Sequence, residues 1–293
     1  MAWSEQPMTF WAPTTTHWSE STPDPNAPEV IRDRADILSA AWQPPIADRI
    51  AFLRERVAGK TVLDVGCVAH DEERFEADSW LHRHLAQAAD RCIGLDLLEE
   101  GVATMRAAGY EAIAHDLSTG LGPLFSLAPF DVIVAGEVIE HLGNLDLLFE
   151  TADLTLAADG ELIITTPNPF APSRVRAGRR GEVWENVDHT TYAFPSGIAE
   201  LAARHGLMLI EATTTKPTRR VWPGPIRWLK RTIRRSHWHR RGFATTAGHV
   251  RAKTLDRLDW FDRAAWALRT RTSSHPHFVG ETFVYVVARG PLP

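Results

Sequence analysis

The stretch TVLDVGC at residues 61–67 decides the fold of this 293-residue chain. A short apolar run ends there on an acid and a glycine, which is typical of a buried parallel strand that opens into a tight turn. Further along, CIGLD at residues 92–96 repeats the pattern and places a carboxylate at the end of a second strand. In an open α/β sheet, the ribose of a nucleotide lies at that edge. The two stretches therefore predict a sheet that binds a nucleotide-like ligand.

Two later stretches complete a set of four motifs, FDVIVAGE at residues 130–137 and DGELIITTPN at residues 159–168. In this order the motifs resemble class I S-adenosylmethionine-dependent methyltransferases, and the resemblance covers residues 58–214 and 278–288. It implies an α/β fold with a Rossmann-like, seven-stranded, mostly parallel sheet whose last strand runs antiparallel between strands five and six. It also implies S-adenosyl-L-methionine as the cofactor.

The chain departs from this family at the glycine-rich loop. The family pattern Asp-x-Gly-x-Gly-x-Gly appears here as Asp64, Gly66, Val68 and His70. Glycine permits positive φ and lets a ligand lie against the main chain. We therefore expect the cofactor to contact a slightly different backbone path.

The resemblance assigns the cofactor to the strand ends. Asp64 and Gly66 would hold its methionine end, Asp96 its ribose hydroxyls and Asp116 its adenine. Asp116 reads equally well as a cap or turn residue before Ser118. The full set expected at the cofactor is Asp64, Gly66, Cys67, Asp96, Leu97, Asp116, Leu117 and Glu137.

The motif Glu-x-x-Glu-His, formed by Glu137, Glu140 and His141, places three ligand-type side chains where they can converge at a helix start. The arrangement is similar to ubiquinone-type O-methyltransferases and small-RNA 2'-O-methyltransferases, in which it holds a divalent metal. A carboxylate-rich set suits Mg²⁺. The alternative is a metal-free cap that forms a wall facing the substrate. His189 is a further candidate ligand, and the catalytic candidates are His141, His189 and Glu137, the histidines as general bases.

Two other histidines, His82 and His84, lie near the start of a helix expected over residues 79–89 and could face a ligand together with Trp80. Residues at i and i+2 point to different sides of a helix, so we do not expect them to form a metal pair.

Charge is unevenly distributed, although the formal net charge is only −5. Residues 212–255 contain no acid and twelve lysines and arginines, in a segment with apolar residues at helical spacing. Residues 215–277 therefore read as a basic helical insertion that forms a substrate lid, a phosphate-binding surface, or a weak contact with anionic membranes through residues 222–241. The alternative to these binding roles is an ordinary lid helix whose basic face is exposed to solvent.

The domain boundaries follow from these features. We expect an N-terminal arm and helix at 1–44, a cofactor-binding core at 45–214, the insertion at 215–277, and a last core strand and tail at 278–293. The arm is rich in proline and tryptophan and either lies on the body or is a disordered leader.

Cys67 and Cys92 give no disulfide framework and read as core residues in a reducing compartment. With no leader-like start and no apolar run of membrane length, a cytoplasmic location is predicted.

These features favour a methyltransferase that acts on a hydroxyl of a small-molecule acceptor, such as a sugar, a glycan precursor or a secondary metabolite. A nucleic-acid partner is less favoured, and the oligomeric state is left open. The alternatives are a non-catalytic methyltransferase-like binding module and a methyltransferase that acts on RNA. A nicotinamide-dependent oxidoreductase is disfavoured because Gly-x-Gly-x-x-Gly is absent.

Overall fold

The computed structural model describes residues 18–20, 22–68, 75, 77–182, 186–215 and 280–289. The tryptophan-rich start of the arm, the acidic loop 71–74 and nearly all of the basic insertion lie outside these residues. The predictions made for those segments are therefore not addressed by the structure.

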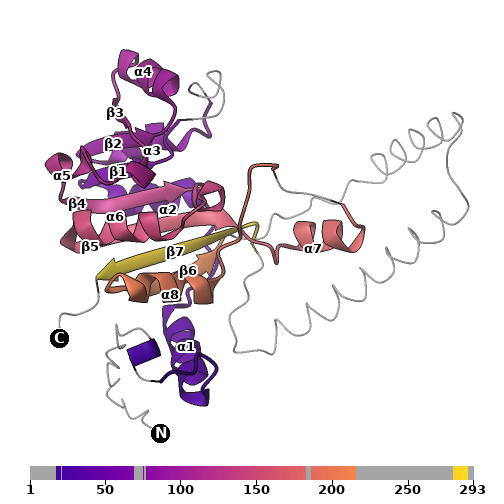
Figure 1. Cartoon of the computed structure of the whole chain (residues 1–293). Helices are drawn as coiled ribbons and strands as arrows, with labels where there is room; N and C mark the ends of the chain where they lie inside the picture. Colours follow the sequence, from indigo (N-terminus) through magenta and orange to yellow (C-terminus); the bar gives the residue numbers. More distant parts are fainter. Residues whose placement is uncertain are drawn as a thin grey trace, which may run out of the picture.

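Seven strands form one sheet in the order β3-β2-β1-β4-β5-β7-β6. Neighbouring strands from β3 through β5 pair in parallel, whereas β7 is antiparallel to both β5 and β6. The predicted sheet and the position of its last strand are thus confirmed (Figure 1). The strands are β1 Thr61–Val65, β2 Arg91–Asp96, β3 Glu111–Ala114, β4 Phe130–Gly136, β5 Leu156–Pro167, β6 Leu207–Thr214 and β7 Thr282–Arg289.

Helices cover both faces of this sheet (Figure 1). One face packs apolar side chains from α2 and α3, and the other packs side chains from α5, α6 and α8. Strand residues alternate between the two faces, so that Val62 belongs to one core and Leu63 to the other. The helices are α1 Pro28–Ala41, α2 Arg49–Val57, α3 Leu81–Ala88, α4 Glu99–Ala107, α5 Leu124–Leu127, α6 Asp146–Thr155, α7 Pro172–Arg179 and α8 Pro195–Arg204.

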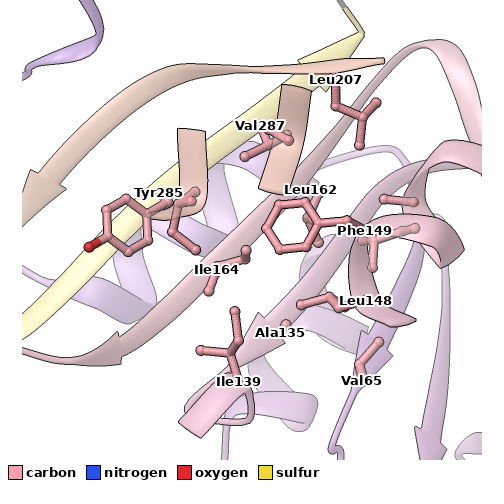
Figure 2. Packing of buried hydrophobic residues seen from close by; sticks show 14 of the residues in the cluster. Val65, Ala135, Ile139, Leu148, Phe149, Leu162, Ile164, Leu207, Tyr285 and Val287 are labelled. Atoms are coloured by element: carbon pink, nitrogen blue, oxygen red, sulfur yellow. The ribbon is translucent and has the colours of Figure 1, made fainter. Parts of the chain in front are cut away.

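The larger core lies between the sheet and α6 and α8 (Figure 2). Phe149 and Tyr285 are its largest fully buried side chains from α6 and β7. The Tyr285 hydroxyl donates to the carbonyl of Ala193 at 2.9 Å, which satisfies its polar end inside the core. Because Tyr285 lies on β7, the last described strand completes a core that the earlier part of the chain begins.

Two predicted boundaries differ from the structure. The helix expected over residues 79–89 is α3, Leu81–Ala88, and the last strand begins at Thr282 rather than 278. Local contacts set other helix ends. α2 begins at Arg49, because the Asp48 side chain caps it by accepting from the Ala51 N–H at 3.0 Å. α6 ends at Thr155, since Leu156 already pairs with Phe130 of β4.

Among the described residues, no helix combines the length and the apolar character needed to cross a membrane.

Candidate functional site

A cavity of about 540 Å³ opens at the carboxyl ends of the parallel strands. This volume lies in the range of pockets that bind cofactors and other small ligands. Leu97, Leu98 and Leu117 supply apolar wall, and carboxylates converge between them. Of the predicted site residues, the cavity is lined by Gly66, Asp96, Leu97, Asp116, Leu117, Glu137 and His141.

The turn after β1 depends on Gly66. This residue has φ +73°, and a Cβ added there would lie 2.2 Å from Cγ2 of Val138. Its N–H donates to the carbonyl of Leu95 at 2.8 Å, so the turn lies directly against β2. No other residue fits without a shift of Val138. The backbone of this turn therefore requires glycine at position 66.

Asp96 holds two loops with one carboxylate. Its Oδ2 accepts from the N–H of Val68 at 2.8 Å, and its Oδ1 accepts from the N–H of Leu98 at 3.1 Å. An ionised carboxylate has about four lone-pair positions. Asp96 can therefore accept further hydrogen bonds from a ligand in the cavity while it keeps both backbone partners.

Asp116 is confirmed as a cap residue and also lines the large cavity. Its Oδ1 accepts from the Ser118 N–H at 2.8 Å, which makes it the N-cap of the short turn Leu117–Thr119. Hydrogen bonding from Ser118, first by its side chain and then by its N–H, lowers the pKa of the Asp116 carboxyl. The same residue lines the cavity, so the capping role leaves it available to a ligand.

A second cavity of about 150 Å³ shares Gly66 and Val68 with the first. Asp64, Trp80 and His82 are among its lining residues. The indole Nε1–H of Trp80 donates to the carbonyl of Cys67 at 3.0 Å and holds the loop after β1 against α3.

Asp64 is buried in β1 and is 2% exposed. Its Oδ2 lies 2.9 Å from Nδ1 of His82, which is 1% exposed. Burial raises the pKa of the Asp64 carboxyl, whereas the imidazole opposes that shift. His82 was expected near a ligand, and a metal pair with His84 was not expected, but its pairing with Asp64 was not foreseen, although an acid inside an apolar strand signals that a partner is needed.

Glu137 follows β4 in a left-handed conformation at φ +60°. Its Oε1 accepts from Nη1 of Arg49 at 3.1 Å, and the same Nη1 donates to Thr165 Oγ1 at 3.0 Å. Arg49, from α2, was not foreseen at the site. This ion pair is partly exposed, so its main effect is to orient the Glu137 carboxylate at the cavity wall.

Glu140, His141 and His189 come together, with ligand atoms that all lie within 4.8 Å of one another. Glu137 of the predicted set does not belong to this group, whereas the further candidate His189 does. The physical reason is local: Ile139–His141 is a short 3₁₀ turn, so Glu137 lies before it and faces Arg49.

Glu140 is 1% exposed, and its Oε2 accepts from Thr166 Oγ1 at 2.8 Å. Its Oε1 is buried without a hydrogen-bond partner among the described residues. Burial, and then repulsion from Glu137, raise the pKa of Glu140 to about 7. The carboxyl therefore binds or releases a proton near neutrality.

The segment that carries His189 is fixed to this turn by Thr190, whose N–H and Oγ1 both donate to the Glu140 carbonyl. Asp188 then places Oδ2 at 3.1 Å from Nδ1 of His141, and both residues line the large cavity. Asp188 was not among the residues expected at the site. Its contact with His141 joins residues far apart in the chain, which no local pattern predicts.

The two cysteines have the predicted structural role. Both are free and buried, and burial raises the pKa of each thiol well above its usual range. Cys67 also lines the small cavity, in the loop where a cofactor contact was predicted.

Residues 40–212 match a family model described as a methyltransferase domain, which is more than half of the chain. The chain belongs to this methyltransferase family. S-adenosyl-L-methionine is the methyl donor of this methyltransferase, and the sheet order with an antiparallel β7 is that of the class I fold.

Two curated relatives are similar to this chain over part of their length. A protein of Mycolicibacterium smegmatis, whose name reads "Probable S-adenosylmethionine-dependent methyltransferase", is 33% identical over 178 residues, which are 55% of this chain and 65% of that one. A tRNA U34 carboxymethyltransferase of Serratia proteamaculans is 30% identical over 124 residues, 41% of this chain and 36% of that one. The matches thus span less than two thirds of either relative.

Two solved structures are also similar to this chain, at low sequence identity. A methyltransferase from Archaeoglobus fulgidus has a TM-score of 0.48 at 13% identity, covering 81% of this chain and 91% of that one. A magnesium protoporphyrin IX methyltransferase from Synechocystis has a TM-score of 0.42 at 18% identity, covering 57% and 73%.

The site of the methyltransferase fits S-adenosyl-L-methionine. The positive φ of Gly66 leaves room that a Cβ would fill, and the large cavity combines apolar walls with the Asp96 and Asp116 carboxylates. A nucleoside needs this combination of a flat apolar slot and acceptors for its hydroxyl and amino groups. We assign the ribose to Asp96 and the adenine to Asp116 as hypotheses of the resemblance that this geometry supports.

Asp96→Ala is expected to weaken the binding of S-adenosylhomocysteine about ten- to hundredfold, because hydrogen bonds to a charged acceptor contribute about 1.5–3 kcal/mol. Isothermal titration calorimetry measures the change. Asp90→Ala is the matched control, since Asp90 is an exposed aspartate at the opposite end of β2. Equal affinity in wild type and Asp96→Ala would show that the ribose lies elsewhere.

Proposed function

We propose that this methyltransferase transfers its methyl group to a hydroxyl of a small-molecule acceptor, such as a sugar, a glycan precursor or a secondary metabolite. The observation that carries the proposal is the wall of the donor cavity formed by His141 and Asp188, directly beside Glu140 and His189. The imidazole of His141 and the carboxyl of Glu140, whose pKa is about 7, would thus lie where the acceptor meets the donor.

Bound S-adenosylmethionine would supply an electrophilic methyl group, whose in-line transfer to an acceptor oxygen forms a C–O bond, breaks the C–S bond and releases S-adenosylhomocysteine. The chain then has to align the two molecules, exclude water and accept the proton of the hydroxyl. In the neutral tautomer in which His141 Nδ1–H donates to Asp188, the lone pair lies on Nε2. That tautomer is the one that serves as a general base, and Asp188 favours it.

Glu140, His141 and His189 also suit a divalent metal. The buried Oε1 of Glu140 has no hydrogen-bond partner in the described part of the chain and is an acceptor of the kind that a cation satisfies. Mg²⁺ was predicted from a set with two carboxylates, whereas the residues that meet here offer two imidazoles and one carboxylate. Nitrogen donors favour Mn²⁺, Fe²⁺ or Zn²⁺ over Mg²⁺. Such an ion would bind and polarise an acceptor oxygen.

The remaining predictions stay proposals. We propose domain boundaries after residues 44, 214 and 277, and residues 215–277 as a basic helical insertion or lid. RNA is the alternative acceptor, and the name of the Serratia relative, a tRNA U34 carboxymethyltransferase, favours it.

An RNA acceptor that contacts the basic segment predicts an affinity for RNA that falls steeply with salt. An uncharged small acceptor predicts little effect of salt on its affinity.

His141→Ala is expected to lower kcat about 10²- to 10⁴-fold, the range that a general base contributes. The affinity for S-adenosylhomocysteine should stay within about threefold of wild type, because the Asp96 and Asp116 carboxylates, to which the donor is assigned, are unchanged. An acceptor from a panel of sugar and phenol hydroxyl compounds is needed for the rate, followed as S-adenosylhomocysteine release. His205→Ala is the control, since His205 pairs with Asp146 and does not line the cavity. Unchanged kcat in His141→Ala would rule out the base.

A metal site predicts that Mn²⁺ or Zn²⁺ binds the chelator-treated protein at one ion per chain, as measured by calorimetry. His189→Ala and Glu140→Gln should each weaken that binding about tenfold or more, because each removes one of three ligands. Glu137→Gln should leave it within a fewfold. Absence of binding in wild type, with turnover insensitive to chelator, would favour the metal-free wall.

A further inference from the structure

Two exposed phenylalanines meet in space although they come from different elements. Phe170 follows β5, and Phe194 is the N-cap residue of α8. Their ring centroids are 5.7 Å apart with the ring planes at 49°, and the two residues are 55% and 43% exposed. A flat apolar group such as a nucleobase stacks well on exposed aromatic rings.

The backbone holds both rings in place. Asn168 is fully buried, and its Oδ1 accepts from the Phe170 N–H at 2.9 Å while its Nδ2 donates to the Gly280 carbonyl at 2.7 Å. The residue before Phe194 is Ala193, whose carbonyl accepts from the Tyr285 hydroxyl in the core. The exposure of the rings is therefore a property of fixed segments.

The ring pair lies close to the groups proposed for the acceptor. Thr166, four residues before Phe170, donates its hydroxyl to Glu140 at 2.8 Å. Thr190, four residues before Phe194, donates its N–H to the Glu140 carbonyl at 2.8 Å. Because four residues of chain span at most about 14 Å, both rings lie near the turn that carries His141.

Positive charge adjoins the ring pair on α7. This helix begins two residues after Phe170, and Pro172–Arg180 contains four arginines and no acid. Figure 1 shows α7 beyond the carboxyl ends of the strands, apart from the helices that cover the faces of the sheet. The guanidinium group of arginine matches the geometry of phosphate.

Two of these arginines hold the helix in place. Arg174 donates to the Glu281 carbonyl at 3.0 Å, and Arg180 forms an ion pair with Glu182. Arg176 and Arg179 are three residues apart and therefore share one side of the helix. This side of α7 is the one that suits an anion.

We propose that the acceptor is a nucleotide-linked sugar, whose base stacks on Phe170 and Phe194 and whose phosphates meet Arg176 and Arg179. The inference rests on the proposed transfer to a hydroxyl and names the substrate class. In the reaction, a sugar oxygen forms a C–O bond with the methyl carbon, the C–S bond of the donor breaks, and the hydroxyl proton passes to His141 Nε2.

A single nucleotide fits this surface better than a nucleic-acid strand does. Sites for single strands stack successive bases on a series of aromatic side chains. In the part of the chain that the structure describes, the only other exposed phenylalanine is Phe125, which belongs to α5. The surface thus offers one base position.

The test uses calorimetry on protein saturated with S-adenosylhomocysteine, so that the donor cavity is filled. The probes are the diphosphates of uridine, thymidine and guanosine, the three nucleosides themselves, and inorganic pyrophosphate. At least one diphosphate should bind wild type about tenfold or more tightly than both its nucleoside and pyrophosphate, because it makes both kinds of contact.

The variants separate the two contacts. Phe170→Ala and Phe194→Ala should each weaken the nucleoside diphosphate about five- to hundredfold, the range of base stacking, and leave pyrophosphate within about threefold. Arg176→Gln and Arg179→Gln should each weaken the diphosphate and pyrophosphate and leave the nucleoside within about threefold. Unchanged affinity for S-adenosylhomocysteine shows that each variant is folded.

Phe125→Ala and Arg204→Gln are the matched controls. Phe125 is an exposed phenylalanine on α5, and Arg204 is an exposed arginine that pairs with Glu200 at the end of α8. Both variants should bind every probe as wild type does.

Wild type that binds no nucleoside diphosphate more tightly than pyrophosphate would overturn the proposal, whatever the variants do. Turnover then separates it from the proposed function. Methylation of unphosphorylated sugars or phenols without affinity for nucleoside diphosphates would overturn this inference alone. Methylation of an RNA oligonucleotide, with no turnover of any nucleotide-linked sugar, would overturn both.

Discussion

The carboxylate of Asp96 is the contact on which the site depends. It accepts from Val68 N–H, in the loop after β1, and from Leu98 N–H, in the loop after its own strand. The Gly66 N–H is held by Leu95 of the same strand. These bonds join the ends of β1 and β2 into one rim, and hydrogen bonds to an ionised acceptor are the strong ones. The large cavity has its shape because this rim is fixed.

The opposite wall of the cavity depends on the buried carboxyl of Glu140, which lies in the short turn Ile139–His141. Glu140 is held by Thr166 from β5, and its carbonyl anchors Thr190 from the loop before α8. The loop thereby delivers His189 and Asp188 to His141. Burial raises the pKa of Glu140 to about 7, so that a small change in its surroundings changes its charge. The wall at the ends of β1 and β2 is thus rich in carboxylates, whereas the opposite wall, which we propose as the acceptor side, brings Glu140 together with His141 and His189.

The sequence predicts the sheet well because the information is local. The strands at 61–65 and 92–96 are continuous apolar runs closed by an acid or glycine, and the last strand alternates. Helix ends are less predictable, since they depend on caps such as Asp48 and on pairing such as Leu156 with Phe130. The cavity residues inferred from the motif positions, among them Asp96 and Asp116, do line one cavity.

The sequence does not reveal which side chains far apart in the chain form hydrogen bonds or ion pairs with each other. His82 meets Asp64 across the sheet edge, Arg49 reaches Glu137 from α2, and both pairs depend on how helices pack on strands. The Glu-x-x-Glu-His spacing implied convergence on a regular helix, but the left-handed backbone at Glu137 separates it from Glu140. Spacing rules apply only where the backbone is regular.

The most direct measurement is a calorimetric titration of the full 293-residue chain with S-adenosylhomocysteine. Saturable binding at one molecule per chain, with a Kd near the micromolar range, is expected from a cavity with this number of fixed polar contacts. An absence of saturable binding at millimolar ligand would contradict the assignment of the cavity to the methyl donor.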